Sequence, residues 1–81
     1  MSKPTTKKGK HGTLYLYEIE YSDQDDPGCP IFVKRSWGYS KDHVVERWME
    51  SSSEDPGWKL ISIATVPETG VIRSREKIHV E

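Results

Sequence analysis

The 81-residue sequence has little cysteine, few apolar residues and no long hydrophobic run. Its single cysteine, Cys29, excludes an internal disulfide framework, and the Cys and His residues form no four-ligand zinc pattern. No run approaches the roughly 18 apolar residues of a membrane span. The basic start MSKPTTKKGKHG lacks the apolar stretch of a secretory signal. We therefore expect a soluble cytoplasmic protein in a reducing setting, with no membrane contact and no metal site.

A catalytic signature is also missing. Cys29 could act as a nucleophile only with a histidine as base. His11, His43 and His79 fall in different sequence contexts, and none has a carboxylate at a spacing that would orient it locally. No glycine-rich phosphate loop occurs. We predict a non-catalytic protein without a cofactor.

Composition indicates one small domain. Apolar residues are 33% of the chain and charged residues 31%, so the core must be small and the surface very polar. A second core could not be built from a chain of this length. Three Trp, four Tyr and one Phe can each bury a large area, which favours a small aromatic core.

Period-two alternation predicts a β-hairpin and a third strand. Within residues 13–22 (TLYLYEIEYS), the odd positions from 15 to 21 are all apolar, whereas the even positions from 14 to 20 begin with leucine and end with glutamate. Alternation resumes over residues 31–38, so these two segments should pair as an antiparallel hairpin. Residues 57–67 are apolar at both parities, which is typical of a central strand covered on both faces. A short last strand is expected through Val71 and Ile72.

A helix is predicted to begin after Ser40. The Ser40 hydroxyl can accept a hydrogen bond from an N–H of the first turn, and Tyr39 and Val44 have hydrophobic-staple spacing. Four apolar residues form a stripe that should face the sheet: Val44, Val45, Trp48 and Met49. The segment SSSEDPG should end the helix.

The order β-β-α-β predicts an α+β two-layer domain, with one helix packed on one face of the sheet. A right-handed crossover makes the third strand parallel to the second. Placing it beside the first strand gives a mixed sheet with the first strand in the middle. We expect a flexible basic tail over residues 1–12, one domain over 13–73, and a charged tail over 74–81 that is disordered or a short edge strand.

One helix cannot cover both faces of such a sheet. We expect it to cover the odd face of residues 13–22 and to leave Leu14, Leu16 and Phe32 exposed on the far face. An exposed apolar patch marks an interaction surface, so these residues are predicted anchors for a protein partner or for a homodimer. The alternative is that one of the two terminal segments folds back over them.

The segment YSDQDDPGCP raises the question of calcium. Counted from Asp23, Asp25 and Gly28 fit an EF-hand loop, but Pro27 and Lys34 take positions that require oxygen ligands. High-affinity calcium binding is therefore not expected.

The same region predicts a charged docking surface. Five acids occur within residues 18–29 without a base: Glu18, Glu20, Asp23, Asp25 and Asp26. Projected from a hairpin, they would suit a basic groove on a partner, where charge accelerates and orients docking. The alternative is a solvated turn that is acidic only for solubility.

Direct nucleic-acid binding is the second functional hypothesis. The stretch FVKRSWGYSK and the following helix place bases around aromatic side chains, which can stack on unpaired nucleotides. The residues concerned are Lys34, Arg35, Trp37, Lys41 and Arg47. We consider this hypothesis the weaker one, because the net charge is −1 and no RNA-binding motif is present.

In size, acidity and minimal α+β build, the chain resembles small accessory proteins of phages and mobile elements, which often bind and inhibit a host protein. The resemblance is one of composition and fold level only. It implies an inhibitor or adaptor of anti-defence or anti-CRISPR-like type, acting in the cytoplasm of a host cell. The expected partner is a protein, such as a nucleic-acid-handling complex with a basic groove.

Overall fold

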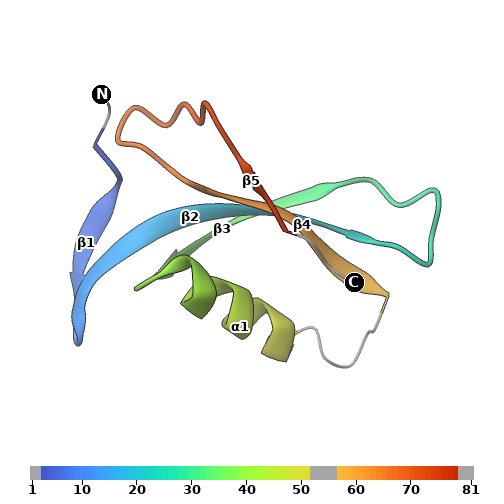
Figure 1. Ribbon diagram of the computed structural model, residues 1–81, viewed down its shortest axis with the longest axis horizontal. Coiled ribbons are helices and arrows are strands. Elements are labelled where there is room, and N and C mark those ends of the chain that lie inside the picture. The colour runs from blue at the N-terminus through green and yellow to red at the C-terminus, as the bar shows by residue number, and fades with distance from the viewer. Residues whose placement is uncertain (1–2, 52–56, 79–81) are drawn as a thin grey trace.

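The computed structural model describes residues 3–51 and 57–78. Six elements follow one another along the chain: β1 (Thr6–Gly9), β2 (Gly12–Asp23), β3 (Phe32–Gly38), α1 (Lys41–Ser51), β4 (Trp58–Thr65) and β5 (Glu76–Lys77). Figure 1 shows a curved sheet with α1 on one side of it. The predicted α+β fold with one helix on one sheet face is confirmed.

The sheet is organised around β2, the longest strand. β3 pairs with β2 along one edge, while β1 and then β4 pair with it along the other. The expected position of the third predicted strand beside the first is therefore confirmed. The expected mixed sheet is wrong, because every described pair of neighbouring strands is antiparallel. β3 and β4 run in the same direction, but β2 separates them.

A β-bulge in β4 explains part of its apolar pattern. Glu20 pairs with Ser62 and Tyr21 pairs with Leu60, so Ile61 is the extra residue. The shift places both Leu60 and Ile63 on the face that α1 covers. Leu60 and Ile63 have opposite parity but lie on the same face, so these two residues do not require a strand that is covered on both faces.

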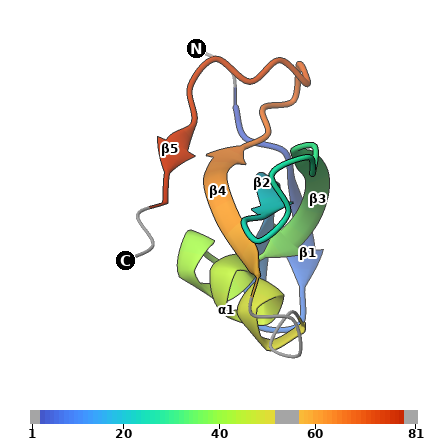
Figure 2. The ribbon, with the colours of Figure 1, turned by 90° about the vertical axis from the view of Figure 1, so that its right-hand side faces the viewer.

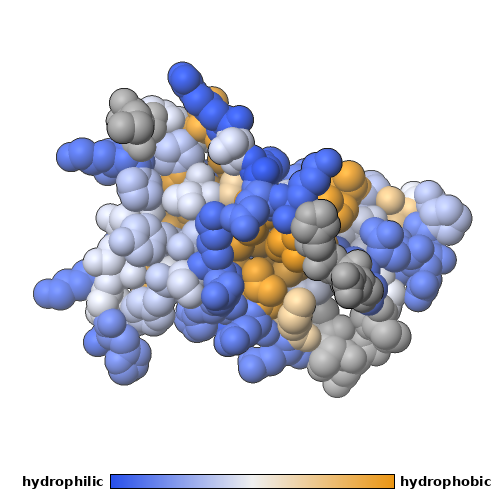
Figure 3. Space-filling model, viewed as in Figure 1, coloured by the Kyte–Doolittle hydropathy of each residue, from blue (hydrophilic) through white to orange (hydrophobic). Residues whose placement is uncertain are grey.

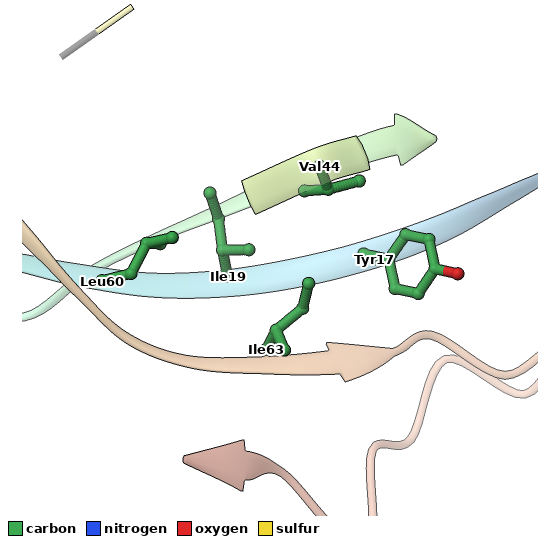
Figure 4. Packing of buried hydrophobic residues seen from close by; sticks show 5 residues of the cluster. All are labelled: Tyr17, Ile19, Val44, Leu60 and Ile63. Carbon is green, nitrogen blue, oxygen red and sulfur yellow. The ribbon is translucent and has the colours of Figure 1, made fainter. Parts of the chain in front are cut away.

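The core lies between α1 and the sheet. Figure 4 shows its central side chains pointing toward one another from β2, α1 and β4: Tyr17, Ile19, Val44, Leu60 and Ile63. The four apolar residues at odd positions 15 to 21 of β2 belong to this cluster or pack against it, as predicted. Met49 is the exception in the predicted helix stripe, since it is 49% exposed. Because Met49 directly follows Trp48 in the helix, the Met49 side chain points to the flank of the helix rather than to the sheet.

The first turn of α1 has the predicted N-cap. The backbone N–H of His43 donates to Ser40 Oγ at 3.1 Å. Just before the cap, Gly38 lets the helix approach β3 closely, because a Cβ at Gly38 would lie 2.4 Å from Val44 Cγ2. The helix ends at Ser51, and residues 52–56 of the predicted stop signal lie outside the described residues.

The two terminal segments each contribute a strand to the sheet. The flexible tail expected over residues 1–12 is wrong for Thr6–Gly9, which pairs with β2, and Thr5 N donates onward to Val66 O at 2.9 Å. Backbone pairing needs no apolar side chains, so polarity alone does not exclude a strand. Near the other end, β5 is a short edge strand within residues 74–81, one of the two forms expected there, whereas no described strand runs through Val71 and Ile72. Residues 1–2 and 79–81 lie outside the described residues.

Apolar side chains gather near the middle of the helix side of the molecule, with hydrophilic residues around them (Figure 3). A helix of 11 residues therefore covers this face only in part. Within the described residues, no helix has the length and apolar character needed to cross a membrane.

Candidate protein-binding site

The loop between β2 and β3, residues 24–31, is held in shape by aspartate side chains. Asp23 Oδ1 accepts a hydrogen bond from Asp25 N at 3.0 Å, and Asp26 Oδ1 accepts one from Gly28 N at 3.0 Å. These are Asx-turn contacts, in which an aspartate replaces a backbone acceptor. Gln24 N also donates to Gly57 O at 2.8 Å, which ties the loop to the start of β4.

The loop presents its negative charge to solvent. Asp25 and Asp26 are exposed, and the Asp25 carboxylate has no hydrogen-bond or ion-pair partner among the described residues. Gly57 lies directly beneath: a Cβ there would be 2.5 Å from Asp23 Oδ1 and 2.7 Å from Asp25 Oδ2. We call residues 23–29 the acidic loop.

Glu18 and Glu20 do not belong to the acidic loop, and the prediction that grouped all five acids is wrong for these two. They lie in β2 on the face without the helix, because their even positions point away from Tyr17 and Ile19. Glu18 is only 7% exposed and accepts from Arg35 Nε at 3.1 Å and from Arg75 Nη2.

Glu20 extends this charged network. Its Oε1 accepts a hydrogen bond from Ser62 Oγ at 2.5 Å and lies 3.6 Å from Arg75 Nε. Arg75 therefore joins the segment before β5 to two residues of β2. We call Glu18, Glu20, Arg35, Ser62 and Arg75 the ion network.

Two side chains near the middle of β2 have shifted pKa values. Burial by itself raises the pKa of the Glu18 carboxyl, but hydrogen bonds and positive charge from Arg75 and Arg35 outweigh it, so the pKa is lowered from its ordinary value. On the other face, burial raises the pKa of the Tyr17 hydroxyl, although the charge of Lys41 opposes the shift. Glu18 is thus an ionised structural group rather than a proton donor at neutral pH.

Phe32 lies on the helix face, so its predicted far-face position is wrong. It pairs directly with Tyr21, and paired residues of antiparallel strands share a face. Its ring stacks on Tyr21 at 5.8 Å between centroids and lies 5.7 Å from Trp58. Trp48 of α1 approaches Tyr21 at 5.8 Å. These four residues form an aromatic cluster beside the acidic loop.

Leu14 and Leu16 do lie on the far face, but they form no large exposed patch. Both are half-buried, opposite Lys7 and Trp37 respectively. Lys7 Nζ lies 4.5 Å from the centre of the Trp37 ring, a cation–π contact that spans β1 and β3. The Lys7 side chain of the basic N-terminal segment thus lies over part of this face, although β1 itself lies beside β2 in the sheet.

Exposed apolar residues occur at the hairpin end instead. Ile31, Phe32 and Val33 are 57%, 41% and 54% exposed, directly after the acidic loop. Of these three residues, only Phe32 was a predicted interaction residue. The exposure of all three residues could have been inferred from their position at the start of an edge strand.

The basic residues of the nucleic-acid hypothesis are not gathered on one surface. Alternation sends Lys34 to the helix face and Arg35 and Trp37 to the far face. Arg35 is engaged by Glu18, while Lys41 Nζ contacts Glu76 Oε2 at 2.5 Å. Arg47 Nη1 donates to the Trp37 carbonyl oxygen at 2.8 Å.

Candidate catalytic groups are separated as well. Cys29 precedes β3, whereas His11 and His43 both contact Tyr39, just past the other end of that strand. His79 lies outside the described residues. A hollow of about 920 Å³ between β4 and the segment before β5 is lined by four charged residues, Lys41, Arg73, Arg75 and Glu76, together with uncharged ones such as Ile63 and Val71. In residues 3–51 and 57–78, no group of three or more His, Cys, Asp or Glu could hold a metal ion.

Comparison with protein-family models, curated proteins and solved structures finds no match. The function has to be argued from the acidic loop, the aromatic cluster and the exposed apolar residues between them.

Proposed function

We propose that the protein is a small non-catalytic protein-binding module, an inhibitor or adaptor that docks through its acidic loop and Phe32. The observation that carries this proposal is an ordered loop with exposed carboxylates beside a large apolar side chain that is 41% exposed. Charge on a preformed loop steers and orients an encounter, while an aromatic anchor holds the complex.

The chemistry of the surface defines the partner. Asp25 and Asp26 would lie against lysine and arginine side chains, and Phe32 would enter an apolar pocket next to them. A basic groove with an apolar wall has both features, and such grooves occur in proteins that handle nucleic acid. An acidic loop in that groove would compete with the phosphate groups of the natural ligand.

A comparison of capture by matched variants tests the proposal. The tagged protein and three variants are used to capture proteins from nuclease-treated host lysate, followed by quantitative mass spectrometry. Asp25→Lys reverses a charge that has no structural role, and Phe32→Ser removes the anchor. Glu68→Lys is the control, since it makes the same charge reversal at an exposed site outside the loop.

The expected partner is retained by wild type and by Glu68→Lys, and is reduced about tenfold or more by Phe32→Ser, as for a binding hot spot. Asp25→Lys should also reduce capture, with an unchanged melting temperature. Equal capture of every protein by all four forms contradicts the proposal.

The nucleic-acid hypothesis receives less support from the placement of its residues. Arg35, Lys41 and Arg47 already have partners within the chain, and Lys34 faces away from Trp37. We expect no gel shift with single- or double-stranded probes at low salt. A shift that weakens steeply with added salt would favour this hypothesis instead.

A further inference from the structure

The outer edge of β3 has unpaired backbone groups. Leu16 N donates to Thr5 O and Leu16 O accepts from Val66 N, so the Leu16 backbone faces away from β3. Its pair-mate Trp37 therefore faces away from β2, and its carbonyl accepts from Arg47. By alternation, the N–H and C=O groups of Arg35 and Val33 also point outward, and no described strand pairs with them. In Figure 2, β3 forms one edge of the sheet.

The open part of this edge is short and has a defined middle. At one end Arg47 occupies the Trp37 carbonyl, and at the other β3 begins at Phe32, one residue after Ile31. The free stretch therefore runs from Ile31 to Arg35, with Val33 at its centre. Exposed backbone edges of this kind are templates for pairing with another strand.

Side chains along the stretch are ordered so that it complements itself. Three exposed apolar residues are followed by two basic ones in the sequence IFVKR. In an antiparallel pair of two copies centred on Val33, Phe32 lies opposite Lys34 of the second copy. Ile31 then lies opposite Arg35 of the second copy. The alkyl stems of the basic residues can cover the apolar side chains in this arrangement.

Other symmetric registers are less favourable. Centring the pair on Lys34 places two lysines directly opposite each other, and centring it on Arg35 does the same for two arginines, which is destabilising. In a pair centred on Phe32, only Phe32 itself would lie opposite a residue of β3 in the second copy, because β3 begins at Phe32. Charge and strand length together thus favour the register centred on Val33.

We propose that two copies of this chain associate through their β3 edges, in an antiparallel two-fold pair centred on Val33. The pair joins the two sheets into one and covers Ile31, Phe32 and Val33 of each copy. The interface is isologous, as in most homodimers. It uses the outer backbone of β3 rather than the loop carboxylates, so it does not rest on the proposed function. The two interfaces share Phe32, however, so a copy paired in this way would not present Phe32 to another protein.

Sedimentation equilibrium over a wide concentration range tests association. The interface is smaller than the standard size of stable complexes, so we expect a dissociation constant between about 1 µM and 1 mM. Wild type should rise from 9.3 kDa toward twice that mass. Val33→Lys places two added positive charges opposite each other at the two-fold axis, so this variant should stay monomeric. Val71→Lys, at another exposed valine (61%), should associate like wild type. A wild type that is monomeric throughout overturns the proposal.

Disulfide trapping tests the register independently of that variant. In a Cys29→Ser background, Val33→Cys brings two Cα atoms to about 5.5 Å, the spacing of a hydrogen-bonded antiparallel pair, which is within disulfide reach. Lys34→Cys places its pair diagonally, about 7–8 Å apart, beyond that reach. Cross-linking of the Val33→Cys form alone supports the proposal. Cross-linking through Lys34→Cys, or through neither, overturns it.

Discussion

Successive residues of β2, Glu18 and Ile19, are both buried, but by different physics. Ile19 is 1% exposed among hydrocarbon side chains of α1 and β4, whereas Glu18 is 7% exposed among charged ones of β3 and the segment before β5. One face of the sheet is therefore stabilised by removal of apolar area from water. The other depends on compensation of a desolvated charge.

The difference teaches how a chain with 33% apolar residues can fold around a two-faced sheet. A second apolar layer would need a second helix, which the chain does not have among its described residues. Instead, Arg75 and Arg35 cross the open face and supply hydrogen bonds to Glu18. The apolar face should resist changes of pH, and the charged face should not.

Truncation of the apolar face should have the largest effect. Ile19→Ala deletes buried methyl groups and leaves a cavity, so we expect a loss of about 3–4 kcal/mol in the free energy of unfolding. Val71→Ala, at an exposed site, should change it by less than about 0.5 kcal/mol. Urea denaturation followed by tryptophan fluorescence measures both. A loss at Ile19 as small as that at Val71 would show that α1 does not pack on this face.

Neutralising the charged face should have a smaller effect. Glu18→Gln keeps the shape but removes the charge that accepts from two arginines, which we expect to lower stability by roughly 2 kcal/mol at pH 7. Arg75 and Arg35 are partly exposed and can be rehydrated, so the loss stays below that of Ile19→Ala. If Glu18→Gln were as stable as wild type, the ion pairs of Glu18 would only offset the cost of removing its charge from water.

The pH dependence separates the two faces. The pKa of Glu18 is lowered in the folded state from its ordinary value of 4.5. Its contribution is therefore present above that value and is lost as the pH falls through the folded pKa. The stability gap between wild type and Glu18→Gln should shrink as the pH falls below about 4.5, while the gap to Ile19→Ala stays nearly constant. A gap at Glu18 that is independent of pH contradicts the assigned role of its charge.

The apolar face could be predicted from the sequence because its signals are local. Odd positions of β2 and the stripe of α1 identify their own buried sides by period alone. The bulge at Ile61 could not be predicted, since it depends on how β4 pairs with β2. Nor could β1, because Thr6–Gly9 is held by backbone pairing and carries no apolar pattern.

The candidate site was predictable only in part for a similar reason. The acidic loop follows from its composition and turn residues. The engagement of Glu18 and Glu20 in ion pairs depends on Arg75, which is 57 residues away along the chain from Glu18. The face of Phe32 depends on the hairpin register, which pairs it with Tyr21. Contacts distant in sequence decided which charged residues stay exposed.

The smallest effect should come from the cap of α1, which belongs to neither face. Ser40→Ala removes the acceptor of the His43 N–H, so we expect a loss of about 1 kcal/mol. Ser40→Asp restores an acceptor at the positive end of the helix and should recover most of that loss. Because the cap supports only the helix, Ser40→Ala should leave the pH dependence attributed to Glu18 unchanged. A cap variant that altered this dependence would mean that α1 and the ion network are coupled through the sheet, and that the two faces do not act independently.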